Sequence, residues 1–207
     1  MRVLSFDVGT RTLSLCIMQE STVHLWTILD LHGQDKKLTM HDLSARAVAA
    51  LKNLNLFETW GPQAVLIETQ RGGKFGNATM VSMSHVIHAF CLTACAYMGV
   101  SVPVIFMSPT AKVNAAVSVL PPEQLAKPAV MADDATERQR NYAFYKANKQ
   151  VSVKAVQHLL PQFTLPPNDF ATIKKKDDLA DTFMQAYAYL HPPPPPPPKS
   201  RKRKTLD

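Results

Sequence analysis

Five acidic residues stand where ordinary surface chemistry does not explain a carboxylate. Asp7 interrupts an apolar run near the N-terminus, and Glu68 ends a second apolar run, AVLIE. Asp177, Asp178 and Asp181 gather near the C-terminal end. A charge that leaves water is strongly destabilising unless a partner compensates it. These acids are therefore candidates for one shared site.

The three C-terminal aspartates open a predicted helix over residues 177–190. Its apolar stripe is formed by Leu179, Phe183, Ala186, Tyr187 and Leu190. Asp181 is three residues from Asp178 and four from Asp177, so the carboxylates are neighbours that repel one another. A purely structural interpretation also exists, because lysines 174–176 could neutralise the acids and the helix dipole favours acids at an N-terminus.

Acids that converge on one sheet edge require positive charge between them. Oxygen ligands of this kind suit Mg²⁺ or Mn²⁺, and the chain has no histidine and cysteine set typical of zinc. The three cysteines, Cys16, Cys91 and Cys95, lack the spacing of a disulfide framework, which indicates a reducing, intracellular compartment. Cys91 and Cys95 lie on a helical pattern and are predicted to be buried thiols; the alternative, a zinc-binding pair, lacks a second pair of ligands. The sequence therefore predicts a divalent metal site.

The elements that must position these acids alternate between strands and helices. Strands are predicted over 2–8, 12–20, 22–30, 64–70 and 102–109, and helices over 44–56, 78–98, 141–160 and 177–190. The three strands at the N-terminus form an antiparallel meander, and Asn77 is the expected N-cap of the second helix. This order predicts an α/β fold with a mixed sheet.

Two segments depart from this pattern. Residues 114–140 are irregular and are predicted to form a mobile insertion in a domain that spans residues 1–191. Seven prolines at 192–198 and the basic run KSRKRK form a stiff spacer and a disordered tail over 192–207. The net charge of +7 favours a polyanionic partner, although the tail supplies five of the positive charges. No stretch long and apolar enough for a membrane span, and no export signal, is expected.

The motifs FDVGT, IET and DDLAD, in this order and at this spacing, resemble those of the RuvC-type Holliday junction resolvases. The resemblance covers residues 1–190 outside the insertion, and its form is nearest to resolvases of large DNA viruses (poxvirus and iridovirus type) and fungal mitochondria. It implies an RNase H-like fold with a mixed five-stranded sheet flanked by helices. It also implies a magnesium-dependent endonuclease that resolves four-way DNA junctions by paired cuts.

Carried over by position, the family's metal ligands fall on Asp7, Glu68, Asp178 and Asp181. Asp177 is one residue early, and the sequence does not separate it from Asp178 as the ligand. Two Mg²⁺ ions per site, with Mn²⁺ as a substitute, would activate water and stabilise the leaving oxygen. We expect Asp7 to bridge both ions, Glu68 and one terminal aspartate to hold one, and the other aspartate to complete the second.

Basic and aromatic residues would meet the DNA. Lys112 and Lys149 resemble the family's lysines near the scissile phosphate, although solvated surface lysines would look the same. Past Glu68, Arg71 and Lys74 could contact phosphates and Phe75 could wedge into an open junction, or the segment could be a plain surface loop.

The two-fold symmetry of a junction predicts a homodimer. The helix over 78–98 is either its interface or a helix buried in its own fold, with His85 and His88 as core or interface residues.

Other functions compete with this one. DVGT also begins the phosphate loop of sugar kinases and actin-like ATPases, but the chain is short for their two domains and has no glycine after Gly99. A second RNase H-like nuclease, cutting RNA–DNA hybrids or other branched DNA, would use the same acids. A non-catalytic DNA-binding module would not need Asp7. The tail could bind an import receptor or a proline-recognising domain, which would place the protein in the nucleus of a host cell or at a cytoplasmic viral replication site.

Overall fold

The computed structural model describes residues 1–70, 72, 76–125, 136–167, 170 and 172–192. Its centre is a five-stranded sheet with the strand order β3-β2-β1-β4-β5. The strands are β1 (Arg2–Val8), β2 (Thr12–Gln19), β3 (Thr22–Asp30), β4 (Ala64–Glu68) and β5 (Val104–Met107). β1 to β3 pair antiparallel, whereas β4 pairs parallel with β1 and β5 with β4. The predicted mixed sheet is therefore confirmed.

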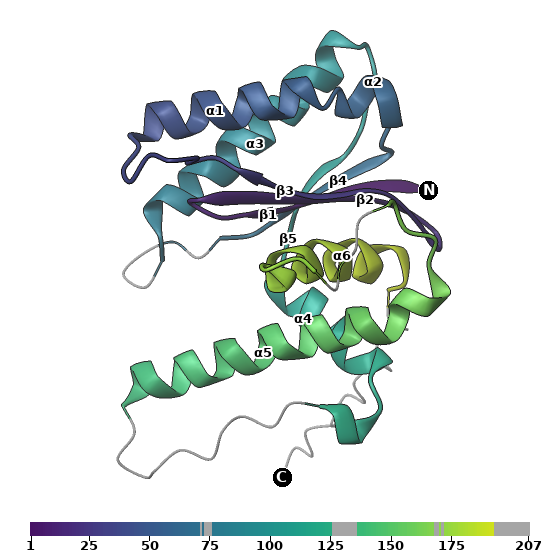
Figure 1. Ribbon diagram of the computed structural model, residues 1–207. Helices are drawn as coiled ribbons and strands as arrows, with labels where there is room; N and C mark the ends of the chain where they lie inside the picture. Colours follow the sequence, from purple (N-terminus) through teal and green to yellow (C-terminus); the bar gives the residue numbers. More distant parts are fainter. Residues whose placement is uncertain (71, 73–75, 126–135, 168–169, 171, 193–207) are drawn as a thin grey trace, which may run out of the picture.

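Helices cover both faces of this sheet (Figure 1). One face carries α1 (Met40–Asn53), α2 (Leu56–Trp60) and α3 (Ala78–Tyr97), and the other carries α4 (Pro109–Val119), α5 (Glu137–Leu159) and α6 (Lys176–Leu190). Short 3-10 turns lie at η2 (Pro122–Gln124) and η3 (Leu160–Gln162). Alternate residues of the strands supply two cores, so Leu4 packs toward α1 and α3 while Val3 packs toward α6.

The turn from β1 to β2 requires a glycine. The amide of Gly9 donates to the carbonyl of Thr12 at 3.0 Å, and a Cβ on Gly9 would lie 2.7 Å from that oxygen. The tight turn fixes the start of β2 directly beside the end of β1. Thr12, at the start of β2, is thereby held at the same end of the sheet as Asp7.

The helix boundaries differ from the prediction where capping residues act. α1 begins at Met40, not Ser44, because Thr39 caps it and forms a capping box with Asp42. α5 likewise begins at Glu137 behind a Thr136 cap. Asn77 caps α3 as predicted, accepting from the amides of residues 79 and 80.

Two helices were not predicted. The short α2 follows α1 directly, and α4 occupies residues 109–119. The expectation of an irregular segment is therefore wrong for residues 114–119, because Ser108 as N-cap and Pro109 at the first position start a regular helix. Residues 126–135 of the predicted insertion, and the tail from 193 onward, lie outside the described residues.

α6 is buried around almost its whole circumference, because β1 and β2 lie against one side of it and α4 and α5 cover the others. Its side chains are buried from Leu179 through Ala186, and the amide of Gln185 donates to the carbonyl of Phe6 at 3.4 Å. On the same side, the ring of Trp26 stacks on Phe170 at 4.9 Å between centroids. α6 is thus held against β1 at the residue that precedes Asp7.

α3 departs from the expectation that the chain has no stretch fit for a membrane. Its 20 residues carry no charge, and its most apolar window has a mean hydropathy of 1.4, enough to cross a membrane by length and composition. Core helices of soluble proteins meet the same criterion but are mostly buried, whereas 28% of this window of α3 is buried, including Met83, Ile87, Cys91 and Cys95. Cys91 and Cys95 are free and buried, as predicted, and Cys16 is free and buried as well.

Candidate active site

Asp7 and Glu68 lie side by side at one edge of the sheet. Phe6 of β1 pairs with Ile67 of β4 in parallel register, so the residue after each of them falls at the same level. The carboxyl ends of both strands point the same way, and Asp7 and Glu68 end up as neighbours across the strand pair. The sequence prediction that brought these two acids together is therefore met by the strand register.

Lys112 of α4 joins the acids of the sheet to those of α6. Its ammonium lies 2.5 Å from the Glu68 carboxylate and 2.9 Å from Asp181 Oδ2. Lys112 is 7% exposed, so this is a buried cation among buried acids. Burial lowers the pKa of Lys112, but the carboxylates of Asp181, Asp7 and Glu68 outweigh that effect and hold the pKa above its usual value.

Asp7 is the most perturbed acid of the group. Burial among its neighbours raises the pKa of Asp7 well above the usual value. The ammonium of Lys112 acts in the opposite direction, whereas Glu68, Asp181 and Asp178 raise the pKa of Asp7 further. The four carboxylates are therefore close enough to interact, and one lysine does not balance them.

The two adjacent aspartates of α6 face different partners. Asp178 accepts a hydrogen bond from Thr12 Oγ1 at 3.2 Å and contributes to the field at Asp7. Asp177 instead forms an ion pair with Lys149 of α5. Lys149 also approaches Asp178 Oδ1 at 3.6 Å. Asp178 thus belongs to the group formed with Asp7, Glu68 and Asp181. Asp177 lies outside this group, next to Lys149 of α5.

The carboxylates have the oxygen donors that a divalent cation prefers, but they are not placed around a position that a cation could occupy. Oxygen-only donors with one strongly raised pKa form a set that Mg²⁺ or Mn²⁺ would stabilise. Among the described residues, no three histidine, cysteine, aspartate or glutamate side chains are placed to hold an ion as they stand. The ammonium of Lys112 lies between Glu68 and Asp181, where positive charge is required. A bound cation would therefore have to displace this lysine from its carboxylates.

The comparisons with known proteins bear on the fold. No protein-family model and no curated protein matches the chain. Among solved structures, the yeast mitochondrial Holliday junction resolvase Ydc2 matches with a TM-score of 0.53 at 19% identity, over 91% of this chain and 78% of that one. The Thermus thermophilus RuvC structure matches with a TM-score of 0.53 at 14% identity, over 92% of this chain and 95% of that one. This chain has the RuvC-type fold.

A further match shows the same fold in a DNA complex. T. thermophilus RuvC in complex with a Holliday junction substrate has a TM-score of 0.54 at 14% identity, with 92% of this chain and 95% of that chain covered. The RNase H-like architecture expected from the sequence motifs is therefore confirmed at the level of the fold.

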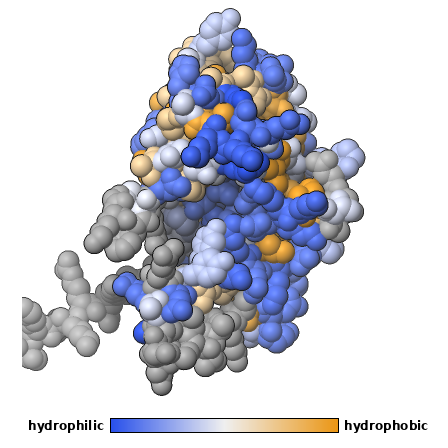
Figure 2. Space-filling view, turned by 60° about the vertical axis from the view of Figure 1, so that its left-hand side comes forward, coloured by the Kyte–Doolittle hydropathy of each residue, from blue (hydrophilic) through white to orange (hydrophobic). Residues whose placement is uncertain are grey.

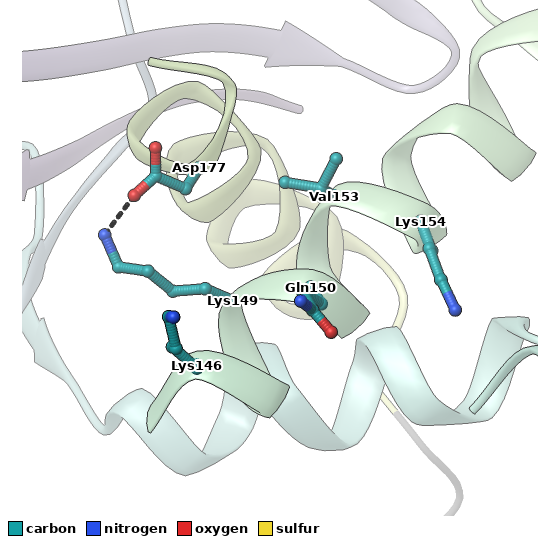
Figure 3. A pocket seen from close by; sticks show the side chains of 6 residues that line it. All are labelled: Lys146, Lys149, Gln150, Val153, Lys154 and Asp177. Atoms are coloured by element: carbon teal, nitrogen blue, oxygen red, sulfur yellow. Dashed lines mark hydrogen bonds and ion pairs between the residues drawn. The ribbon is translucent and has the colours of Figure 1, made fainter. Parts of the chain in front are cut away.

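On the RuvC-type fold, the acids lie at the side of the molecule on which β1 ends. Figure 2 shows this side hollowed between the α1–α3 layer and the lower helices, with mainly hydrophilic residues around the hollow. An open depression of about 390 Å³ adjoins it, lined by Lys146, Lys149, Gln150, Val153, Lys154 and Asp177 (Figure 3). Its lysines could receive an anionic ligand beside the acids.

Not every predicted site residue can be placed. Arg71, Lys74 and Phe75 lie outside the described residues. Lys112 and Lys149, expected near the scissile phosphate, are both engaged by carboxylates. His85 and His88 of α3 pack against the ring of Phe106, at 5.4 and 5.0 Å between centroids, on the layer away from the acids.

Sequence reasoning missed two residues that touch the acids. Thr12 donates to Asp178, and Lys175 Nζ lies 3.8 Å from Asp178 Oδ2 and 3.3 Å from Thr12 Oγ1. A signal for Thr12 existed, because a tight turn after Asp7 must return the chain to the same edge within a few residues. For Lys175 the sequence indicates only a charge that could neutralise the aspartates, as for the other lysines of 174–176.

The raised pKa of Asp7 predicts how pH affects stability without metal. The folded chain holds the Asp7 proton more tightly than the unfolded chain, so this group's contribution is complete below the ordinary pKa of 3.8 and is lost as pH rises through the raised pKa. Asp7→Asn has no such loss. Its free energy of unfolding in EDTA should exceed that of the wild type by a margin that grows from about pH 4 toward neutrality. Urea unfolding at several pH values measures this margin, and a margin independent of pH would contradict the assignment.

Proposed function

We propose that the protein is a structure-selective endonuclease that resolves four-way DNA junctions by paired, metal-dependent phosphodiester hydrolysis. The observation that carries the proposal is the convergence of Asp7, Glu68 and Asp181 around Lys112 at one end of the sheet, with Asp178 close enough to act on Asp7. The RuvC-type fold supports it, because two proteins with that fold are described as acting on or binding Holliday junctions.

The metal ligands in this proposal are Asp7, Glu68, Asp178 and Asp181. Two Mg²⁺ ions held there would supply an activated water and stabilise the charge on the phosphate and the leaving oxygen. Thr12 keeps the Asp178 carboxylate oriented by its hydrogen bond. Mn²⁺ is the expected substitute, since it accepts the same oxygen ligands.

Lys112 has a second role in the proposed reaction. With cations held by the acids, the Lys112 ammonium would lose its carboxylate partners and would be free to donate a hydrogen bond to a non-bridging oxygen of the scissile phosphate. Lys149 keeps Asp177 in place and lies beside the depression where the neighbouring phosphate would sit. The loop with Arg71, Lys74 and Phe75 is proposed to contact the junction next to the cut.

A homodimer is part of the proposal because symmetric cuts need two sites. The outward face of α3 supports it, since this uncharged helix exposes Leu92 at 47% and Tyr97 at 90%. A second copy packed on this face would cover apolar surface that α1 and the sheet leave open.

The substrate class is tested with a panel of labelled DNAs. Purified protein with Mg²⁺ is incubated with a four-way junction, a linear duplex of the same sequence and an RNA–DNA hybrid. The proposal predicts nicks in the junction at symmetric positions and no cutting of the duplex. Cutting of the hybrid in place of the junction would keep the metal site and assign a different nuclease. Tight junction binding without any cut would indicate a binding module.

The tail is proposed to direct location. KSRKRK has the composition of a nuclear import signal, and the prolines before it would hold it away from the domain. A reporter fused to residues 192–207 should enter the nucleus, and neutralising the basic run should abolish entry. A reporter that is distributed equally with and without the basic run would contradict this role.

A further inference from the structure

The N-terminal half of α5 is not packed into the domain. Among the residues of α5 whose burial is described, which leave out 138 and 141, those that are buried all lie in the second half: Val151, Ser152, Ala155, Val156 and Leu159. Figure 1 shows the other half reaching out beyond α4 and α6. A helical segment that buries so little needs another reason for its composition.

This outer half carries exposed aromatic side chains close together. Tyr142 is 60% exposed, Phe144 55% and Tyr145 54%. Large aromatic rings in water are unfavourable, so a group of them on an unpacked helix indicates a ligand that covers them.

Two of these rings are paired with lysines. The Lys146 ammonium lies 5.5 Å from the centre of the Tyr142 ring, and the Lys149 ammonium 5.2 Å from the centre of the Tyr145 ring. Each pair is four residues apart, so all four side chains share one side of the helix. We name this surface, formed by Tyr142, Tyr145, Lys146 and Lys149, the tyrosine–lysine face.

The tyrosine–lysine face is continuous with the acids. Lys149 pairs with Asp177 and approaches Asp178, which lies beside Asp7. Lys146 and Lys149 also line the depression next to Asp177 (Figure 3). A ligand on this face would therefore extend from the proposed cutting site outward along α5.

The chemistry of the face selects the ligand. No acidic residue occurs between Tyr142 and Leu159, and three lysines do, so the face suits a polyanion. Tyrosine rings stack on the open faces of unpaired bases, which a continuous duplex does not offer, while lysines contact the phosphates. A protein partner or a second copy would require acidic groups of its own to match this charge.

We propose that the tyrosine–lysine face binds an unpaired DNA strand, with bases stacked on Tyr142 and Tyr145 and phosphates at Lys146 and Lys149. The inference rests on the proposed function for its location beside the cut, and it adds how the protein recognises strands that leave pairing at a branch. None of these contacts requires a metal ion, so binding can be measured without cleavage.

The test uses the full chain in EDTA and fluorescence anisotropy with a labelled single-stranded oligonucleotide. The double variant Tyr142→Ala/Tyr145→Ala should lose about tenfold or more in affinity for the single strand, the order expected for removed stacking. The conservative double variant Tyr142→Phe/Tyr145→Phe should bind like the wild type, because a phenyl ring still stacks. Both variants keep Lys146 and Lys149.

Phe144→Ala is the matched control. Phe144 is similarly exposed, but it lies roughly 200° around the helix from Tyr142 and off the tyrosine–lysine face. Its removal should leave single-strand affinity unchanged. Equal losses in Phe144→Ala and the double alanine variant would overturn the inference, as would unchanged binding in the double alanine variant or no single-strand binding by the wild type.

The outcomes also separate the inference from the proposed function. If the double alanine variant loses single-strand affinity and the wild type cuts no junction, the tyrosine–lysine face is supported as a single-strand site and the proposed nuclease activity is refuted. Normal single-strand binding by the double alanine variant of an active resolvase would refute the face alone. A shift of the double alanine variant from dimer to monomer in sedimentation, with DNA affinity unchanged, would make the face a self-association surface and overturn the inference.

Discussion

Asp7→Asn is expected to abolish junction cutting and to leave junction binding intact. The amide has the size of the carboxylate but no charge, so it removes a proposed metal ligand from the centre of the cluster without removing a basic side chain. The single-turnover rate of cleavage with Mg²⁺ should fall by more than about a thousandfold, which is the order of loss seen when a central catalytic group is removed. Anisotropy with a labelled junction in EDTA should give the wild-type affinity.

Asp35→Asn provides a matched control for this loss. Asp35 makes a surface ion pair with Arg46 of α1, and its side chain is about half exposed. The same carboxylate-to-amide change there should leave the cleavage rate unchanged. Cleavage by Asp7→Asn within about tenfold of the wild type would contradict a role for Asp7 in holding metal.

Lys112→Met is expected to destabilise the metal-free protein strongly, and Mg²⁺ should restore most of the loss. Lys112 is a buried cation between Glu68 and Asp181, and its removal leaves buried carboxylates without a partner. Breaking a buried ion pair from one side costs about 3 kcal/mol or more. A divalent cation that binds these acids replaces the missing charge and stabilises the folded state by mass action.

Urea unfolding in EDTA and in Mg²⁺ measures both parts of this prediction. Lys149→Met is the comparison, because its pair with Asp177 is partly exposed and should contribute about 1 kcal/mol or less. Equal stability of Lys112→Met and wild type in EDTA would show that the lysine does not balance the acids. A large loss that Mg²⁺ does not reverse would show that the acids do not bind the ion.

The sequence was sufficient for the sheet and for the acids at its edge. An apolar run identifies β1, and apolar residues at alternate positions identify β2 and β3. An acid near the end of each of two apolar strands, Asp7 and Glu68, is unexplained by packing. Parallel pairing of β1 with β4 then makes the two acids neighbours. This part of the site follows from strand identity alone, which sequence periodicity reports well.

The rotation of the helices about their own axes could not be predicted from the sequence. Whether Asp177 or Asp178 faces Asp7 depends on how α6 is rotated on the sheet, since consecutive residues differ by roughly 100°. Packing of Leu179 and Phe183 on the sheet fixes that rotation and turns Asp178 inward. In the same way, Lys112 points inward because of how α4 is rotated against its neighbours. The sequence does carry a signal for the start of α4, since Ser108 is an N-cap and Pro109 favours the first helical position.

We propose that the two active sites of one dimer, each with metal bound, make both cuts in one junction within the same complex. A supercoiled plasmid that extrudes a cruciform tests it directly, because paired cuts within one complex give a linear product and separate cuts give a nicked circle. We expect linear plasmid as the main product with Mg²⁺ and no product in EDTA. Nicked circle as the stable end product, or product of either kind in EDTA, would contradict it.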